Sequence, residues 1–555
     1  MRRSLLLASV CVLMLAGLAG MASADDGLAE GRQLLDQGKA AEAITVLLPV
    51  VQGDPKNSEA ILLLGRAYLA AGRADSAEAM GRAYADMNGK KPEGYVLASK
   101  AGVAQGKLAE AYIIIRKGVR SVKRNPAVLT ELGYVHLAAD SIDQAIVSFS
   151  QAKEVDPASA IAYRGLGEAY LKLNADAVAI LQFEESLRAD STQTDLKYQL
   201  ARLYYKERRF NDAAALYASI INLTPGEDSA SRELGLMLHL GKQYSNAAKV
   251  LEPYVGRHPD DVEAWKTYMD ALLQTRQYEA VVAAADHILE VAPETHEAHR
   301  SAAKSHYMLK TYDRSIYHYQ ELDRLDSLSA DDSRYLAKAH HDSGNDTTAV
   351  SFFQQSLAQD SSQVDVYAEI GAAYMKLKQF DRAAWAYKQK FSMDSTATSA
   401  YVNYALCMEQ LQKWQDGREA LVRALEQNPA YIPGYYHLGY VLSQMDSTQS
   451  ARKAYEAFVG MADSLQSRYG SDLFSAYRFI AVVYLADKKY SQAEGALVRA
   501  IALKPNDVEL HLWLAQTLHA LNKRDEAQKE YQRVLKLDPN NKDAKKGLDI
   551  LELYE

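Results

Sequence analysis

The sequence has few cysteines, prolines and large aromatic residues, and these shortages limit what the protein can be. Its 555 residues include two Cys, 13 Pro, four Trp and 10 Phe, against 36 Tyr. So few cysteines leave the stability of the fold to packing rather than to disulfides. The remaining composition, 48% hydrophobic and 24% charged, is typical of a folded chain with a large buried core. A net charge of −8 argues against a general nucleic-acid binder.

Long apolar runs are also missing, with one exception at the N-terminus. Arg2 and Arg3 precede an apolar stretch over residues 5–19, and small residues follow at Ala22 and Ala24. This pattern predicts a secretory signal peptide over residues 1–24, cleaved after Ala24. The alternative is a retained membrane anchor, for which the run is short. No other stretch is long and apolar enough to cross a bilayer, so we expect no membrane span after cleavage.

Cleavage would remove two basic residues, no acidic residue and one of the two cysteines. The net charge would change from −8 to −10, and Cys407 would be the one cysteine left. Because Cys407 lies between Leu406 and Met408 on a helical stretch, we expect it to be buried.

A period of 34 residues runs through almost the whole chain. Frames that begin at residue 24 recur without slippage up to residue 432, and after an insertion two more begin at residues 474 and 508. The twentieth position of these fifteen repeats is Ala in twelve, and only Val281 is larger than Ser. Gly recurs at position 8, an aromatic residue at position 24 and Pro at position 32. Such a period is the signature of a repeat array.

The repeating columns predict two packed helices in each repeat. Positions 4, 7, 8 and 11 lie on one helical stripe, and positions 20, 24 and 27 lie on one face of a second helix. Small residues at positions 8 and 20 allow the two backbones to approach closely, and the aromatic residue at position 24 fills the space beside them. Proline at position 32, as in Pro157 or Pro293, ends the second helix.

This pattern resembles the tetratricopeptide repeat (TPR) family over about residues 25–541. The fourth repeat carries the family motif at Leu132, Gly133, Ala145, Phe149 and Pro157. The third repeat departs from it with Gly102 at position 11, and the second with Gly81 at position 24. The resemblance implies an all-α fold, a right-handed superhelical solenoid of stacked antiparallel helix pairs with a long concave surface.

The resulting organisation is a signal peptide over residues 1–24, repeats one to thirteen over 25–457 and an insertion or extended helix over 458–473. Repeats fourteen and fifteen follow over 474–541, and a C-terminal capping helix over 542–555. Ala544, Leu548 and Leu551 form the apolar stripe that such a helix would bury. We expect the insertion to lengthen the second helix of repeat thirteen and to bend the array or separate a C-terminal module. The alternative is a simple loop.

A basic, Tyr-bordered ladder is predicted on the face of the first helices that the family resemblance places on the concave wall. Its residues, at positions 5, 9 and 12 of repeats five to ten, are Arg164, Tyr198, Arg202, Tyr205, Arg232, Lys266, Arg300, Lys304, Tyr307, Arg334 and Lys338. An anion-accepting groove is one interpretation, because Arg binds carboxylates through paired N–H donors. The other is a self-neutralised face, since position 2 is often acidic and lies three residues before position 5.

Seven histidines between residues 287 and 341 suggest either a metal or pH-sensing site or aromatic packing. His306 and His340 occupy position 11, which is Tyr in several repeats, so packing explains them. No HExxH and no Cys pair occurs, so we expect no metal and no cofactor. Gly235–Lys242 resembles a phosphate-binding loop only superficially, since Gln243 replaces the required Ser or Thr. We therefore expect no enzyme.

The function expected from the sequence is a non-catalytic protein–protein interaction scaffold of the cell envelope, which holds partner segments, acidic ones among them, in a groove. The alternative is a periplasmic scaffold for polysaccharide secretion or outer-membrane assembly, binding an anionic glycan or a pore component. The expected compartment is the periplasm, with an extracellular location as the alternative.

Overall fold

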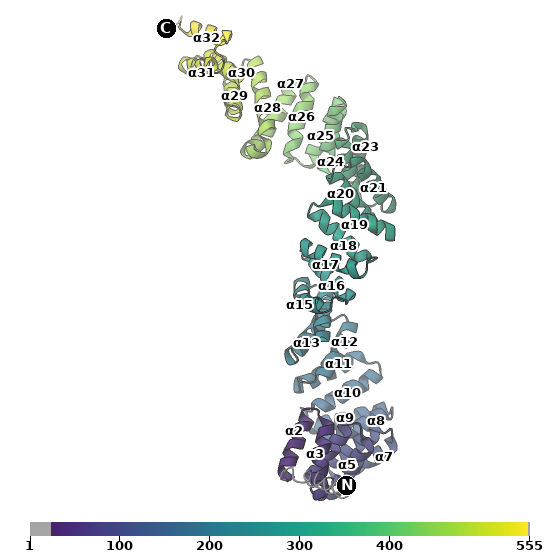
Figure 1. The fold of residues 1–555 in the computed structure, drawn as a ribbon. Helices are drawn as coiled ribbons and strands as arrows, with labels where there is room; N and C mark the ends of the chain where they lie inside the picture. The colour runs from purple at the N-terminus through teal and green to yellow at the C-terminus, as the bar shows by residue number, and fades with distance from the viewer. Residues whose placement is uncertain (1–23, 553–555) are drawn as a thin grey trace, which may run out of the picture. The chain divides into compact units, whose positions relative to one another are not determined.

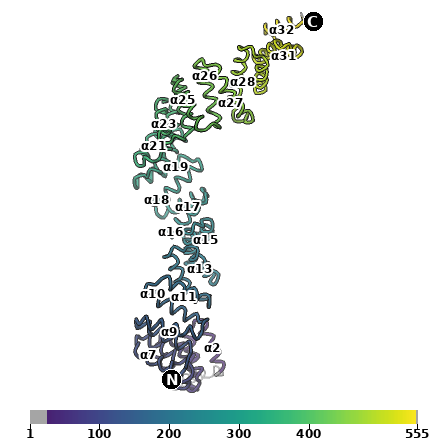
Figure 2. The backbone as a smooth tube through the Cα atoms, turned by 180° about the vertical axis from the view of Figure 1, so that it is seen from behind, coloured from purple at the N-terminus to yellow at the C-terminus, as the bar shows by residue number. Residues whose placement is uncertain are grey.

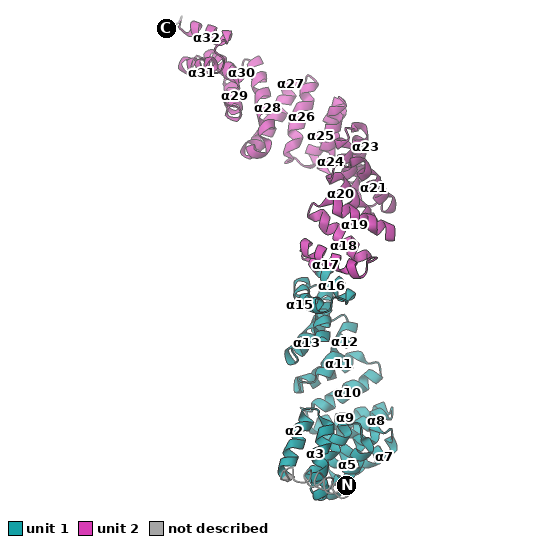
Figure 3. Cartoon of the chain, viewed as in Figure 1, with its two compact units in different colours: residues 1–271 teal, residues 272–555 magenta. Residues whose placement is uncertain are grey.

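The structure is a computed structural model that describes residues 24–552. The predicted signal peptide therefore lies almost wholly outside the described residues, as do the last three residues of the capping segment. The described chain contains helices and no strand. It divides into two compact units, residues 1–271 and residues 272–555 (Figure 3).

In the first compact unit, seven repeats each contribute two helices joined by a short turn (Figure 1). The first helices are α2 (Ala24–Asp36), α4 (Ser58–Ala70), α6 (Glu93–Ala104), α8 (Pro126–Ala138), α10 (Ala160–Lys172), α12 (Thr194–Lys206) and α14 (Asp228–Leu240). The second helices are α3 (Ala40–Gly53), α5 (Ala74–Met87), α7 (Leu108–Ser121), α9 (Ile142–Val155), α11 (Asp176–Ala189), α13 (Phe210–Leu223) and α15 (Tyr244–Arg257). The boundary between the units falls within α16 (Val262–Gln274).

The second compact unit continues the same alternation, which Figure 2 follows along the backbone. Its helices up to repeat twelve are α17 (Tyr278–Val291), α18 (His296–Met308), α19 (Tyr312–Leu325), α20 (Ala330–Asp342), α21 (Asp346–Gln359), α22 (Asp365–Lys376), α23 (Phe380–Met393), α24 (Thr398–Gln410) and α25 (Trp414–Gln427). Then come α26 (Ile432–Gln444), α27 (Thr448–Ala462), the 3-10 turn η1 (Asp463–Leu465), α28 (Gln466–Ala486), α29 (Tyr490–Leu503), α30 (Val508–Ala520), α31 (Arg524–Leu537) and α32 (Lys542–Glu552). The expected all-α solenoid of helix pairs is confirmed.

The large residue at position 24 packs against bare backbone at position 8. A Cβ added to Gly133 would lie 2.5 Å from the ring of Phe149, and one added to Gly167 would lie 2.3 Å from the ring of Phe183. Phe149 also lies against Gly165 of the next repeat, at 2.3 Å by the same measure. The ring thus fills the space between two repeats, and both Phe149 and Phe183 are completely buried.

The turn between the two helices of each repeat uses a left-handed residue at position 15. All fifteen repeats have positive φ there, although only Gly38, Gly72, Gly106 and Gly344 are glycine. The next residue closes the first helix, as where the Ser141 N–H donates to the His136 carbonyl at 2.9 Å. This is a Schellman-type helix end, which satisfies carbonyls that the helix leaves open.

The aromatic residue at position 4 connects consecutive repeats through its polar tip. The Tyr95 hydroxyl donates to the carbonyl of Gly89 at 3.1 Å, and the Tyr435 hydroxyl donates to that of Pro429 at 3.1 Å. In both cases the acceptor is position 32 of the preceding repeat. The carbonyl at position 32 of one repeat therefore accepts a hydrogen bond from the next repeat.

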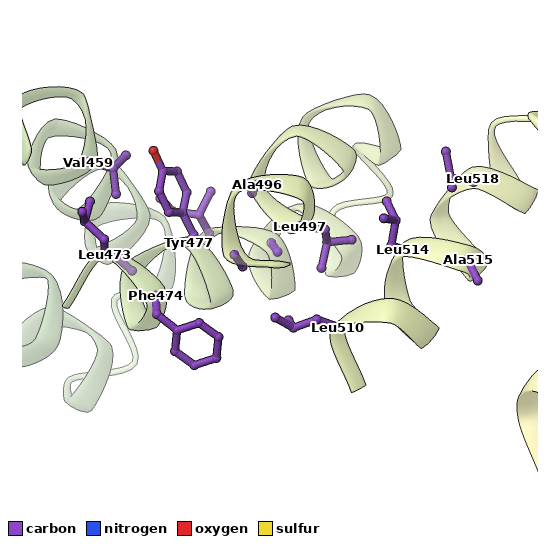
Figure 4. Close-up of a cluster of buried hydrophobic side chains, with 14 of the residues drawn as sticks. Val459, Leu473, Phe474, Tyr477, Ala496, Leu497, Leu510, Leu514, Ala515 and Leu518 are labelled. Carbon is purple, nitrogen blue, oxygen red and sulfur yellow. The ribbon is translucent and has the colours of Figure 1, made fainter. Parts of the chain in front are cut away.

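The insertion after repeat thirteen differs from the expectation. The second helix of that repeat, α27, has 15 residues against 14 in α25, whereas α28, the first helix of repeat fourteen, has 21 and a kink at Tyr469. Tyr469 and Leu473 are buried in a hydrophobic cluster that continues from α27 to α32. Figure 4 shows part of this cluster, with Leu473 among the labelled residues. The inserted residues therefore lengthen mainly the following helix, and repeats fourteen and fifteen share a hydrophobic core with the second helix of repeat thirteen.

The C-terminal helix and Cys407 match their expected packing. In α32, Ala544 and Leu551 are buried and Leu548 packs against the same cluster. Cys407 is completely buried, with its Sγ 3.3 Å from the Sδ of Met375. Among the described residues, no helix has the length and apolar character that a membrane span requires.

Replacing Gly167 by Ala tests the packing of position 24 on position 8. We expect the local free energy of opening of α10 and α11 to fall by about 1–3 kcal/mol, because a methyl group would overlap the Phe183 ring. Native-state hydrogen exchange measures this opening. Gly495→Ala in α29 is the control, since its Cβ would meet nothing within 4 Å, and it should gain about 0.5–1 kcal/mol from helix propensity. Equal effects of the two substitutions would contradict this packing.

Candidate functional site

The predicted basic ladder lies on the first helices, in two sets that belong to the two compact units. In the first unit Arg164 lies on α10, Tyr198, Arg202 and Tyr205 on α12, Arg232 on α14 and Lys266 on α16. In the second unit Arg300, Lys304 and Tyr307 lie on α18, and Arg334 and Lys338 on α20. Each set is described by itself below.

Most cations of the first set are already paired with carboxylates. Arg164 contacts Asp195 of the next repeat at 2.6 Å and Glu168 of its own helix at 2.9 Å. The Arg164 guanidinium holds the pKa of Asp195 below its usual range. Arg232 contacts Asp261 at 2.8 Å. Lys266 contacts Glu263 at 3.0 Å.

The second set is neutralised in the same manner by the following repeat. Arg300 contacts both carboxylate oxygens of Asp332, at 3.0 and 3.1 Å, and Asp332 is 1% exposed. Arg334 binds both oxygens of Glu369 at 2.8 and 2.9 Å. Lys338 contacts that same carboxylate at 3.0 Å. Arg334 and Lys338 lie at i and i+4 on one helix, where like charges repel. Because Glu369 pairs with both, they need no bound guest to offset this repulsion.

Arg202 and Lys304 are the ladder cations with no carboxylate in ion-pair contact among residues 24–552. Arg202 is exposed and lines a cavity of about 410 Å³ together with Tyr198, Tyr205 and Glu233. The Lys304 ammonium lies 5.3 Å from the centre of the Tyr335 ring. The Tyr307 hydroxyl donates to Asp342 at 2.9 Å. As an anion-binding surface, the ladder thus offers fewer free charges than its sequence suggests.

Two hollows on the first helices lie in the first four repeats, away from the predicted ladder. A cavity of about 690 Å³ lies between α2 and α4, and one of about 590 Å³ lies between α4 and α6. Both are lined by Arg66 and Ala70, so they adjoin. We call them together the N-terminal groove. The sequence signal for this groove is the apolar residue at position 5 of the second and third repeats, Leu62 and Val96.

The N-terminal groove combines an apolar lining with cations that have no ion pair. Apolar residues from α4 and α6 form much of its wall: Leu62, Leu63, Leu69, Val96 and Leu97. Arg32 is paired with Glu59, but the exposed Arg66 and Lys100 have no carboxylate in ion-pair contact among the described residues. Glu93, Glu59 and Asp36 also line the groove, and the Oε2 of Glu93 is buried without a hydrogen-bond partner among the described residues. The charge of the groove is therefore mixed, and the part beside Arg66 and Lys100 suits a guest that carries both apolar side chains and negative charge.

A buried acid lies close behind Lys100. Glu131 of α8 is 3% exposed and accepts a hydrogen bond from the Ser99 hydroxyl at 3.0 Å. Burial raises the pKa of Glu131 to about 7, although Lys100 and Ser99 both act to lower it. Because burial favours the protonated form of Glu131, this acid offsets the charge of Lys100 less than an ordinary carboxylate would.

Some of the seven histidines between residues 287 and 341 contact one another, and they do so as packed aromatic rings. His340 stacks on Phe352 with ring centres 5.7 Å apart, and His306 stacks on His318 at 5.5 Å. Within residues 24–552, no group of three His, Cys, Asp or Glu side chains is placed to hold a metal ion.

Arg300→Ala tests whether the ladder arginines stabilise the fold. Removing the guanidinium leaves the carboxylate of Asp332 buried, with the Ser329 hydroxyl as its remaining hydrogen-bond donor among the described residues. We expect α18–α20 to lose about 1–3 kcal/mol of local opening free energy, below the cost in a fully buried pair because Arg300 is partly exposed. Hydrogen exchange of these helices measures the loss. Arg202→Ala, the matched control, should change α12 by no more than about 0.5 kcal/mol. An unchanged α18–α20 would contradict the structural role.

Comparison with known proteins gives matches to one family of repeats. Models described as "Tetratricopeptide repeat" match residues 34–95, 130–194, 198–265, 269–330, 432–464 and 484–548, more than half of the chain. These matches indicate no catalytic family. No curated protein sequence matches the chain significantly.

Solved structures with a similar fold are distant in sequence. The C-terminal part of a TPR repeat-containing protein from Cytophaga hutchinsonii is 18% identical, with 51% of this chain and 99% of that chain covered and a TM-score of 0.39. A thermophilic TPR protein of Thermus thermophilus is 23% identical, with coverages of 33% and 100% and a TM-score of 0.31. YrrB, described as a TPR protein with an unusual peptide-binding site, is 14% identical, with coverages of 34% and 96% and a TM-score of 0.31. The repeat period, the helix pairs and the family matches agree, and the chain belongs to the tetratricopeptide repeat family.

Proposed function

We propose that this chain is a non-catalytic scaffold that holds an extended segment of a partner protein in its N-terminal groove. The TPR repeats support protein–protein interaction as the general activity. The observation that carries the more specific proposal is the pair of adjoining cavities that share Arg66 and Ala70. Each cavity has the size of a small-molecule site, and because the two adjoin, together they can take several consecutive side chains of an extended segment.

The chemistry of the groove specifies the segment. Leu62, Leu69 and Val96 are partly exposed, so the segment gains by burying aliphatic or aromatic side chains there. Arg66 and Lys100 offer N–H donors without an ion pair, so a carboxylate placed between them gains charge-assisted hydrogen bonds. A short peptide with alternating apolar and acidic residues meets both conditions. A polysaccharide would leave the apolar wall unused.

A display library of random linear peptides tests this function. We expect the selected sequences to be enriched in Asp or Glu together with Leu, Ile, Val or Phe. Arg66→Glu with Lys100→Glu should weaken their binding about 10-fold or more, since one lost charge-assisted hydrogen bond contributes about 1.5–3 kcal/mol. Fluorescence anisotropy of labelled peptides measures the affinity, which should also fall as salt is raised.

Two matched charge reversals distinguish binding in the N-terminal groove from binding on the ladder. Arg202→Glu and Lys304→Glu change the same charge on first helices elsewhere, and they should leave the affinity unchanged. If they abolish binding while the groove variant retains it, the ladder is the site. Alginate serves as a glycan probe in the same assay. Charge-dependent binding of alginate without enrichment of any peptide would favour the polysaccharide scaffold instead.

We also propose that the scaffold acts in the cell envelope, in the periplasm or alternatively outside the cell. The support is the basic start, the apolar run and the small residues that end at Ala24. Production in a Gram-negative host should give an envelope-fraction protein whose N-terminal sequence begins at Asp25. Deletion of residues 2–24 should keep the chain in the cytoplasm, because the signal is then missing. Recovery of the uncleaved chain from the cytoplasm would overturn the proposed export.

A further inference from the structure

Repeat nine contains a buried pair of histidines that face each other. His299 of α18 and His318 of α19 are 5% and 6% exposed, and their Nδ1 atoms lie 3.2 Å apart. The other nitrogen of His299, Nε2, lies 3.1 Å from the carbonyl oxygen of Pro293. Since a carbonyl only accepts, His299 Nε2 carries a proton, and its Nδ1 accepts from the Nδ1–H of His318.

This arrangement holds one proton between the two facing nitrogens. A pair with both rings protonated would place two N–H groups against each other and bury two positive charges. Burial, with further contributions from His299, His306 and Arg314, lowers the pKa of His318 to about 4. The pair is therefore compatible with the folded repeat while it is neutral.

The surroundings offer little to stabilise a charged pair. Neither ring has a carboxylate in ion-pair contact among the described residues. Glu321 of α19 opposes the shift of His318, but it is outweighed. From α17, Asp286 acts on His306, whose pKa is still lowered by burial. From α20, Asp332 is already bound to Arg300.

Repeat fifteen has a histidine in the same place, but a carboxylate faces it instead of a second imidazole. His511, at the same repeat position as His299, has its Nε2 3.0 Å from the carbonyl oxygen of Pro505. Its Nδ1 lies 2.6 Å from the carboxylate of Glu530, which occupies the position of His318. A carboxylate therefore faces the Nδ1 of His511, whereas a second imidazole faces the Nδ1 of His299.

We propose that the His299–His318 pair makes repeat nine an acid-sensitive joint, which opens on mild acidification while repeat fifteen stays closed. The sign follows from the linkage between folding and protonation. A histidine with a depressed pKa contributes stability above its unfolded pKa of about 6.5, and this stability is lost as the pH falls toward the folded value. Because each repeat contacts only its neighbours, opening repeat nine exposes the packing faces of repeats eight and ten.

Native-state hydrogen exchange of the full chain at pH 7.5 and pH 5.0 tests this proposal. After division by the intrinsic exchange rates, the opening of residues 296–325 should rise about 30-fold, the value for one group whose pKa falls from 6.5 to about 4. The opening of residues 508–537 should not rise with it. Equal pH dependence of the two segments would overturn the proposal.

A reciprocal exchange of the two partners provides the variants. His318→Glu gives repeat nine the partner of repeat fifteen and should abolish the rise. Glu530→His gives repeat fifteen the partner of repeat nine and should create a rise there. If His318→Glu fails to fold at pH 7.5, the proposal is still tested by the Glu530→His variant and by the comparison of residues 296–325 with residues 508–537 in the unchanged chain. A rise that persists in His318→Glu, or no rise in Glu530→His, would show that another group is responsible.

Discussion

The contact on which the rest of the structure depends is that between a large side chain, present on most of the second helices, and small residues on the first helices. Phe149 lies against both Gly133 of its own repeat and Gly165 of the next, with no room for a Cβ at either position. One ring therefore joins the two helices of a repeat and also sets the spacing to the following repeat. The helical cost of the glycines is offset by this close packing. The same contact occurs with Tyr387 on Gly371 and with Leu251 on Gly235.

Polar contacts between repeats follow from that spacing. Once neighbouring first helices lie at a fixed distance, the long cations at position 5 reach carboxylates of the next repeat, as Arg334 reaches Glu369. The aromatic tip at position 4 reaches the carbonyl at position 32, whether it belongs to Tyr95, Tyr435 or His299. In the second and third repeats the position 5 side chains, Leu62 and Val96, are apolar and form no such bridge. The N-terminal groove lies beside them. Of its cations at position 9, Arg32 is paired with Glu59 of the next repeat, whereas Arg66 and Lys100 have no ion pair among the described residues and stay available to a partner.

A regular array thus acquires local differences through single substitutions within fixed positions. Position 23 is Glu530 in repeat fifteen and His318 in repeat nine, and the backbone around them is equivalent. The change converts a histidine with a carboxylate partner into one that shares a proton with a second imidazole. Similarly, the inserted residues after repeat thirteen leave the core continuous, because Tyr469 and Leu473 enter it from the lengthened helix α28.

The sequence by itself determined the period, the helix pairs, the capping helix and the burial of Cys407. These features depend on residues a few positions apart on one helix, where the 3.6-residue period fixes which side chains share a face. Only the tertiary structure decided which carboxylate meets each arginine, that the insertion lengthens α28, and that Arg66 and Lys100 border a groove. It also decided that His299 meets His318 across two helices. Such contacts depend on the offset between packed helices and on side-chain reach, which a pattern along one chain does not contain.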